Sequence, residues 1–138
     1  MSDSFPLIIM TPERKFFDGE VEAITITTID GEFQILKDHT PITLPLVVGS
    51  IQIKKDGKWK EAFQSEGFLE VSNSMVRVFV QTCEWPEDID AARALAAQQR
   101  AIERMRWQKS MVEYQWTKIA LARAMVRLRI THSKMNID

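Results

Sequence analysis

Arginine side chains recur in the second half of the chain at spacings that would gather them on helix faces. Arg93 and Arg100 are seven residues apart, and Arg123 and Arg127 are four apart, so each pair falls on one stripe of a helix. If two such helices packed together, four guanidinium groups would lie near one another and repel unless an anion or carboxylates filled the space. Because the guanidinium fork suits phosphate oxygens, the pattern favours a phosphate-type anion site.

A simpler interpretation of these arginines is a solvated helix face. They could pair with neighbouring carboxylates in surface salt bridges worth about 0–1 kcal/mol each. The available carboxylates are Glu87, Asp88, Asp90 and Glu103. From Arg93 onward the chain holds ten Lys and Arg against three Asp and Glu, although its overall formal charge is −1. The basic half therefore indicates either a bound anion or an acidic partner surface.

Several other classes of site find no support in the sequence. His39, His132 and Cys83 lack the companions that a metal site needs, and no nucleophile stands with a base, so we expect no catalytic residues. The near-neutral charge argues against non-specific nucleic-acid binding. The single cysteine fits a reducing compartment. No apolar run reaches the roughly 18 residues of a spanning helix, so membrane association would go through a partner.

The three tryptophans of the second half are expected to pack in a core or against a partner rather than to stack on a cofactor. They are Trp85, Trp107 and Trp116. Cys83, at the end of an expected strand, is expected to be a buried small residue.

Helical periodicity begins after Pro86, which suits the first turn of a helix. Asp88 is expected to cap the free amides of a helix running from Ile89 to about Gln108. A second helix is expected over roughly 111–130. Alanine-rich faces would let the two approach closely as an antiparallel hairpin. The connection lacks glycine and proline, so one long helix remains an alternative.

The first half alternates apolar and polar residues in about eight short strands, typical of an antiparallel sandwich or barrel. Asp18-Gly19 and Asp30-Gly31 are expected turns that bound a strand over 21–29. Pro45 predicts an edge or irregular segment over 42–48. Hairpins are expected over 50–63 and 67–80.

An ordered set of short motifs covers nearly the whole chain. They are Thr11-Pro12-Glu13, Phe16-Phe17 with Gly19-Glu20-Val21, Asp30-Gly31-Glu32 with Ile35-Leu36, His39 with Pro41, Gly67-Phe68 with Glu70-Val71, Ile89-Asp90 with Arg93-Ala94, and Ala122-Arg123-Ala124 with Arg127-Leu128. In this order they resemble the epsilon subunit of bacterial F-type ATP synthases. Gln34 departs from the family's usual glycine, and Lys37-Asp38 replaces a commoner Pro-Gly or Pro-Asn pair.

The resemblance implies an α+β fold, with an N-terminal antiparallel β-sandwich over residues 1–86 and a C-terminal antiparallel two-helix hairpin over 87–138. It also implies a non-catalytic rotor subunit on the central stalk, coupling ion-driven rotation to ATP synthesis. The implied location is peripheral, on the cytoplasmic side of the cell membrane and held there only through the complex.

Partners follow from the same resemblance. The sandwich would lie beside the gamma subunit and above the membrane c-ring, with Gln34 and His39 in the loop that faces the ring. The hairpin could fold on the sandwich or extend and hinder ATP hydrolysis. When extended, it would meet the catalytic alpha and beta subunits through Arg123, Arg127 and Arg129.

Relatives that bind ATP in the folded hairpin share a pattern that this chain matches at every position. The matching residues are Glu84, Ile89, Asp90, Arg93, Ala94, Arg100, Arg123 and Arg127. Glu84 and Asp90 would accept hydrogen bonds from adenine or ribose, and Ile89 and Ala94 would form an apolar wall. ATP would thus be a regulatory ligand, with no cofactor required. A stand-alone ATP-binding sensor remains the alternative function.

Overall fold

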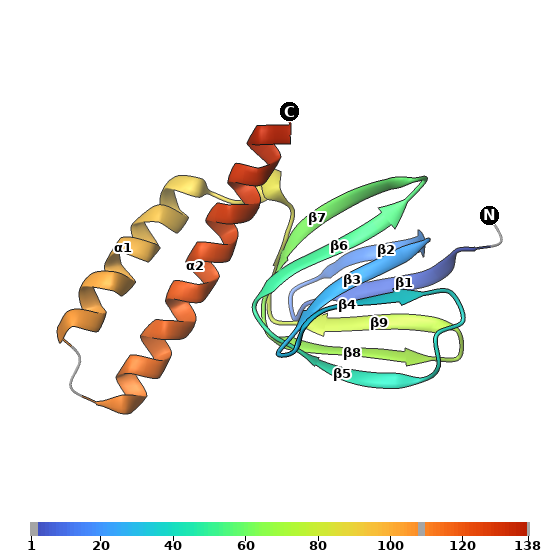
Figure 1. The fold of residues 1–138 in the computed structure, drawn as a ribbon, viewed down its shortest axis with the longest axis horizontal. Helices are drawn as coiled ribbons and strands as arrows, with labels where there is room; N and C mark the ends of the chain where they lie inside the picture. Colours follow the sequence, from blue (N-terminus) through green and yellow to red (C-terminus); the bar gives the residue numbers. More distant parts are fainter. Residues whose placement is uncertain (1–2, 108–109, 138) are drawn as a thin grey trace. The chain divides into compact units, whose positions relative to one another are not determined.

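The computed structural model describes residues 3–107 and 110–137. The chain divides into two units, Met1–Glu84 and Trp85–Asp138. The first holds the strands and the second the helices (Figure 1). The expected fold class, a β-sandwich followed by two helices, is confirmed.

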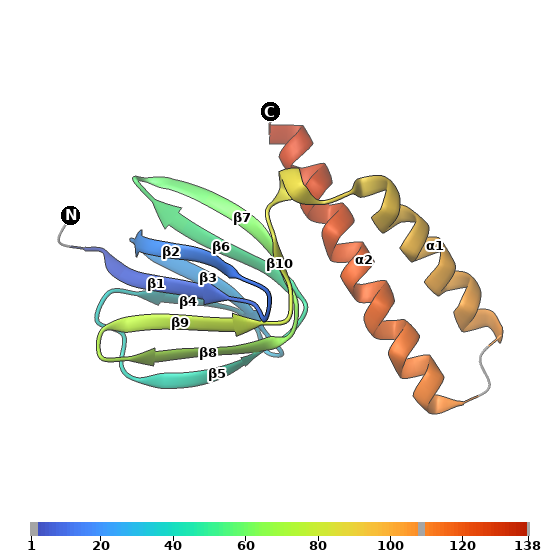
Figure 2. The same ribbon diagram turned by 180° about the vertical axis from the view of Figure 1, so that it is seen from behind.

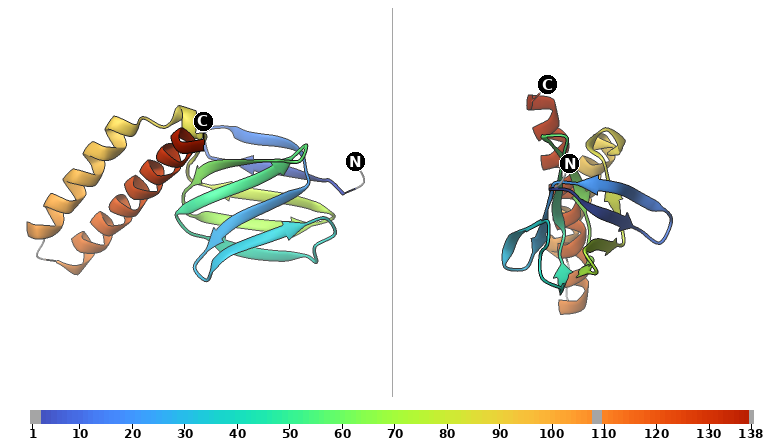
Figure 3. Two further views of the ribbon diagram at one scale, coloured as in Figure 1. Left: turned by 45° about the horizontal axis from the view of Figure 1, so that its top comes forward. Right: turned by 90° about the vertical axis from the view of Figure 1, so that its right-hand side faces the viewer.

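The strands of the first unit form two five-stranded sheets that lie in two layers (Figure 3). The strands are β1 (Phe5–Met10), β2 (Lys15–Val21), β3 (Ala23–Thr28), β4 (Gly31–Leu36), β5 (Ile42–Leu46), β6 (Gly49–Lys55), β7 (Lys58–Gln64), β8 (Gly67–Ser72), β9 (Met75–Val80) and β10 (Cys83–Glu84). The first sheet has the order β2-β1-β9-β8-β5 and the second β10-β7-β6-β3-β4; the short β10 is visible in Figure 2.

Alternating side chains build the core of the sandwich. In β1, for example, Leu7 and Ile9 are fully buried while Pro6 and Met10 are exposed. This period of two places one face of each strand against the other layer. The predicted hairpins β6–β7 and β8–β9 are confirmed, and β5, with Pro45, is an edge strand as expected.

The expected turn at Asp18-Gly19 is wrong. Both residues lie inside β2, where they pair with Ile8 and Leu7 of β1. The chain instead bends at Glu22, whose N–H donates to Lys54 O at 2.8 Å. The predicted strand over 21–29 is therefore divided between two sheets. A continuous ladder with β1 outweighs the local turn preference of Asp-Gly. The turn at Asp30-Gly31 is confirmed, with Gly31 at φ 114°.

One pairing departs from the expected antiparallel pattern. β1 and β9 are parallel, with Leu7 opposite Val76 and Ile9 opposite Val78. A parallel pair needs a long connection, and here almost the whole sandwich lies between the two strands. Short connections predict only pairs of strands that are consecutive in the sequence, so they could not predict the pairing of β1 with β9.

Gln64 joins the two sheets at a buried position. Its Nε2 donates to Thr27 O of β3 at 2.9 Å and to Val47 O, just after β5, at 2.6 Å. The side chain has no exposed surface. It therefore links carbonyls of both layers and satisfies its own buried amide N–H groups.

The helical unit consists of a 3₁₀ turn and two helices: η1 (Pro86–Asp88), α1 (Ala91–Trp107) and α2 (Met111–Ile137). The alternative of one long helix is wrong. α1 and α2 lie side by side and run in opposite directions (Figures 1 and 2). The predicted cap at Asp88 is also wrong, because Asp88 ends η1 and Ile89 is extended. Asp90 caps α1 instead, and Ser110 caps α2 by accepting the Glu113 N–H at 3.1 Å.

Small buried residues mark the seam between the two helices. Ala94 and Ala101 are the buried residues of α1, and Thr117 and Ala124 are buried on α2. Each pair is seven residues apart, the repeat of two helices packed along one stripe. Because these side chains are small, the two backbones can approach closely.

Candidate anion site of the helical hairpin

The residues predicted to bind ATP come from separate parts of the structure. Glu84 lies in β10 of the sandwich unit, whereas the others belong to the helical unit. Ile89 and Asp90 connect η1 to α1. The remaining five lie on the helices: Arg93, Ala94 and Arg100 on α1, and Arg123 and Arg127 on α2.

Asp90 and Ile89 have structural tasks at the start of α1. The Asp90 carboxylate accepts the Arg93 N–H at 3.0 Å, and its backbone carbonyl accepts the Ala94 N–H at 3.0 Å. Ile89 is buried. The Asp90 carboxylate therefore stands at the positive end of the helix dipole, where a negative charge is favoured.

The arginines of the predicted set flank the seam. Arg93 and Arg100 each immediately precede a buried alanine of α1, and Arg123 immediately precedes buried Ala124 of α2. In an antiparallel helix pair, the residue immediately before a seam residue points to the same side of the pair on both helices. These three side chains therefore share one side of the hairpin. Arg127 lies three residues beyond Ala124, on the stripe of α2 that runs beside the seam.

A groove between the helices gathers part of this set. It has a volume of about 520 Å³. Its lining residues are Ala97, Arg100, Ala101, Arg104, Trp116, Thr117, Ile119, Ala120 and Arg123. Among the residues that the structure describes, three guanidinium groups and no carboxylate therefore line this groove, which we call the narrow groove. Arg93 and Arg127 are not among its lining residues.

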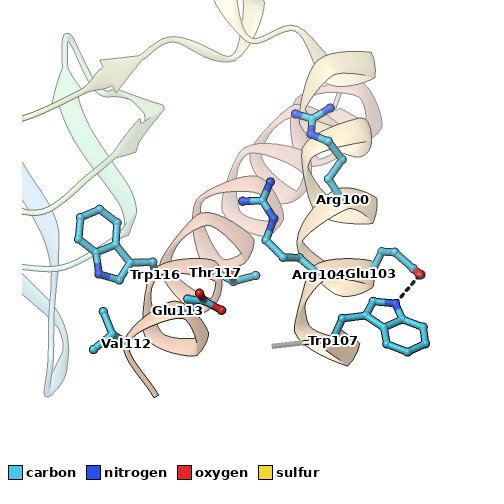
Figure 4. A pocket seen from close by; sticks show the side chains of 8 residues that line it. All are labelled: Arg100, Glu103, Arg104, Trp107, Val112, Glu113, Trp116 and Thr117. Atoms are coloured by element: carbon cyan, nitrogen blue, oxygen red, sulfur yellow. Dashed lines mark hydrogen bonds between the residues drawn. The ribbon is translucent and has the colours of Figure 1, made fainter. Parts of the chain in front are cut away.

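A second groove of larger volume, about 830 Å³, adjoins it toward the hairpin turn (Figure 4). We call it the wide groove. It shares Arg100, Arg104, Trp116 and Thr117 with the narrow groove, and it adds Glu103, Trp107, Val112 and Glu113. In Figure 4, Arg100 and Arg104 extend from α1 toward α2. The two grooves thus differ in charge: two carboxylates join the arginines of the wide groove, whereas the charged residues described in the narrow groove are arginines.

The carboxylates in α1 and at its start bear on the simpler interpretation, in which the arginines form a solvated surface with salt bridges. Glu103 contacts Arg106 at 3.5 Å and accepts the Trp107 Nε1–H at 3.0 Å. Asp90 caps the helix. Neither interaction involves the guanidinium of a predicted site arginine. In addition, the Nε atom of Arg123 is buried, which does not fit a fully solvated face.

Arg104 and Trp116 are the large polar and aromatic lining residues that the predicted site did not include. Arg104 follows Arg100 by one helical turn, and Trp116 precedes Arg123 by seven residues. The same spacing that selected the other arginines could have identified both. Trp107 and Trp116 are 74% and 73% exposed, so they do not pack in a core of the helical unit. The other expectation, packing against a partner, stays a prediction.

The predicted partner-contact residues lie on exposed or half-buried surfaces. Gln34 is exposed on β4, an edge strand, and Arg129 is exposed on α2. His39 is half-buried, with Nδ1 at 2.7 Å from Thr40 O and its ring edge-on to Phe33. Asp38 has φ 63°. Asp adopts this left-handed region more readily than most residues, so the Lys37-Asp38 sequence is compatible with the turn.

The described residues also bear on metal sites and membrane-spanning segments. Within 3–107 and 110–137, no three His, Cys, Asp or Glu side chains gather in a way that could hold a metal ion. In the same ranges no helix is long and apolar enough to cross a membrane.

Cys83 is buried as expected, and burial, with a smaller contribution from the Glu84 charge, raises the pKa of its thiol to about 12.

Comparison with known families matches both units. Residues 4–86 match the family described as the ATP synthase delta/epsilon chain, beta-sandwich domain. Residues 87–131 match the long alpha-helix domain of the same delta/epsilon chain.

Curated relatives agree along almost the full length. The chain is 51% identical over 131 residues to the ATP synthase epsilon chain of Caldanaerobacter subterraneus, covering 94% of this chain and 95% of the relative. It is 44% identical over 126 residues to the epsilon chain of Caldicellulosiruptor bescii, covering 91% and 92%.

Solved structures share the fold at lower identity. A chain of the Euglena gracilis mitochondrial ATP synthase superposes with a TM-score of 0.79 at 22% identity, covering 96% of this chain and 81% of that one. A chain of the Tetrahymena thermophila mitochondrial ATP synthase, from its central stalk and c-ring, gives 0.63 at 16% identity, covering 91% and 95%.

Proposed function

The chain belongs to the delta/epsilon family of ATP synthase subunits, among the epsilon chains, and from this premise we propose a coupling and regulatory role on the rotor. In this proposal it sits on the central stalk with the gamma subunit and the membrane c-ring. It couples ion-driven rotation to ATP synthesis and carries no catalytic residue. It is held at the cytoplasmic side of the cell membrane only through the complex.

The observation that carries the regulatory part is the independent helical unit. Its division from the sandwich falls between Glu84 and Trp85, and its helices pack through small residues such as Ala101 and Thr117. A unit of this kind can move as a body about a short connection. We infer that the hairpin inhibits ATP hydrolysis when it extends to the catalytic alpha and beta subunits, meeting them through Arg123, Arg127 and Arg129.

ATP binding is the second part of the proposal. Arg93, Arg100 and Arg123 flank one side of the seam, where a polyphosphate could offset their mutual repulsion. Asp90 and Ile89 lie at the start of α1, where they would meet the ribose and base; Glu84, the remaining residue of the predicted set, lies in the sandwich unit. ATP would then hold the hairpin folded and oppose its inhibitory extension.

Two arginine substitutions test regulation with opposite expected signs. In the assembled synthase, Arg129→Gln removes a proposed contact of the extended state, so ATP hydrolysis should rise. Arg93→Gln removes an ATP contact, so hydrolysis at a given ATP concentration should fall. The same sign for both would contradict the proposal.

A truncation gives the broader test. ATP hydrolysis is measured for the complex with the full chain and for the complex with a chain that ends at Asp88. The difference gives the inhibition that residues 89–138 exert. Activation on truncation is expected, and an unchanged rate would leave coupling as the only function. Co-purification with gamma and the catalytic subunits separates a rotor subunit from a stand-alone ATP-binding sensor.

A further inference from the structure

The four outer strands of the sandwich differ in how their edges are protected. They are β2 and β5 in the first sheet and β10 and β4 in the second. A free edge can pair with a further strand, and proteins guard such edges with charges, proline, bulges or very short strands. β5 contains Pro45, and β10 has only two residues. β2 has exposed Lys15, Asp18 and Glu20, and its pairing with β1 contains an irregularity.

Strand β4 has none of these protective features along its described length. Its six residues include no lysine, arginine or proline, and Glu32 is the one charged side chain. Its pairing with β3 is regular from end to end. Large apolar side chains are exposed at both ends: Leu36 is 55% exposed, and Ile29, in the turn before the strand, is 82% exposed. β4 is therefore the edge that least opposes a further strand.

The backbone of Thr27 shows which way the N–H and C=O groups of β4 point. Its carbonyl accepts Gln64 Nε2–H at 2.9 Å, and Gln64 belongs to β7, on the side of β3 away from β4. Thr27 lies opposite Glu32 in the β3–β4 ladder, so this pair exchanges no backbone hydrogen bonds and Glu32 points its groups to the free edge. Because the direction alternates along an antiparallel strand, Gln34 and Leu36 do the same.

The free edge of β4 thus offers a regular row of backbone donors and acceptors. It consists of the N–H and C=O groups of Glu32, Gln34 and Leu36, all of which are exposed residues. Among residues 3–107 and 110–137, none of the backbone hydrogen bonds formed outside helices and strands involves these groups. Donors and acceptors that recur at every second residue match the backbone of another extended strand.

We propose that β4 is a docking strand, to which an extended segment of a neighbouring rotor subunit adds as a sixth strand of the second sheet. This inference rests on the proposed function and deepens it, because Gln34 already belongs to the expected partner contacts. The contact is made by the main chain of Gln34 as well as by its neighbours on the edge. A segment with a basic side chain opposite Glu32 and an apolar one opposite Leu36 fits best, since such cross-strand pairs stabilise a sheet.

Proline at position 34 tests the main-chain contact. The measurement is the affinity of the labelled chain for the synthase complex that lacks this subunit. Gln34→Pro removes the edge N–H and leaves a partner carbonyl unpaired, so binding should weaken by about tenfold or more. Edge strands tolerate proline where the N–H would face solvent, and the urea midpoint of the free variant shows whether it remains folded.

Gln34→Ala is the matched control at the same position. It removes the side chain and keeps the backbone N–H, so its affinity should change far less than that of Gln34→Pro. A contact made through the Gln34 side chain would instead weaken binding in both variants.

Hydrogen exchange gives a second readout that needs no substitution. In the free chain the amides of Glu32, Gln34 and Leu36 should exchange quickly, whereas those of Phe33 and Ile35, which face β3, should exchange slowly. In the complex the three edge amides should become slow as well. Phe33 and Ile35 serve as the internal control, because their amides are paired in both states.

The outcomes separate this inference from the proposed function. If the edge amides stay fast in the complex, or if Gln34→Ala weakens binding as much as Gln34→Pro, strand addition is overturned while the rotor role stands. If the free chain sediments as a dimer with these amides already protected, β4 pairs with a second copy, and the proposed partner is overturned. Failure of the unmodified chain to join the complex overturns the proposed function together with this inference.

Discussion

The carboxylate of Asp90 accepts a hydrogen bond of 3.0 Å from the backbone N–H of Arg93. Both residues belong to the predicted ATP pattern, and this contact also starts helix α1. One oxygen of Asp90 thus serves the helix, while the charge of the group stands at the helix N-terminus. In the proposed ATP site, folding of the hairpin and recognition of the ligand would therefore depend on the same side chain.

Substitution of Asp90 should separate these two roles. Asp90→Ala removes the cap and should cost about 1 kcal/mol of helix stability, seen as a lower urea midpoint of the helical ellipticity. Asp90→Asn keeps a capping oxygen but removes the charge. It should lower the midpoint less than Asp90→Ala does, while weakening ATP binding in calorimetry. If Asn and Ala destabilise the helix equally, the capping role is contradicted.

Loss of an arginine beside the seam should weaken ATP binding directly. Arg93→Gln and Arg123→Gln each remove a charge-assisted contact and should raise the Kd for ATP by about tenfold or more. Lys118→Gln provides the control, because Lys118 is exposed on α2 and lines neither groove. An equal loss in all three variants would point to overall charge rather than to a site.

Enlarging a seam residue should loosen the hairpin. Ala101→Leu inserts a large side chain between closely packed helices and should cost about 1–3 kcal/mol. Ala92→Leu adds the same atoms at an exposed position of α1, where Leu and Ala have similar helix propensity. Urea titrations followed at a helical band compare the two. Coincident midpoints would show that Ala101 does not lie at a close contact.

Alkaline pH should destabilise the sandwich through Cys83. Burial raises its thiol pKa from 9.0 to about 12, so the folded protein keeps a proton that the unfolded chain loses. Between these values the unfolded state binds fewer protons, and stability falls as pH rises, by at most about 1.4 kcal/mol per pH unit from this group. Well below pH 9.0 the Cys83 thiol is protonated in both the folded and the unfolded state, so it does not make stability depend on pH.

Cys83→Ala isolates that contribution from other groups that titrate at high pH. Urea midpoints at about pH 8 and about pH 10 should fall less in Cys83→Ala than in the unmodified chain. An identical fall in both proteins would assign the pH dependence to groups other than Cys83.

Local sequence patterns predicted those parts of the fold that neighbouring residues decide. The hairpins β6–β7 and β8–β9 follow from alternating residues around short turns, and Pro45 marks the edge strand β5. Helix α1 follows from its apolar periodicity. Each of these features depends on contacts within a few residues, so sequence spacing suffices to predict it.

Tertiary structure decided the features that depend on distant partners. Asp18-Gly19 stays in a strand because β1 pairs with it, and β1 pairs with β9 across most of the sandwich. Arg104 enters the candidate site only because α2 packs against α1 and closes a groove around it. The sequence by itself determined the family motifs and the arginine spacing. Which guanidinium groups share one groove depended on how the two helices pack, since a single helix cannot bring them together.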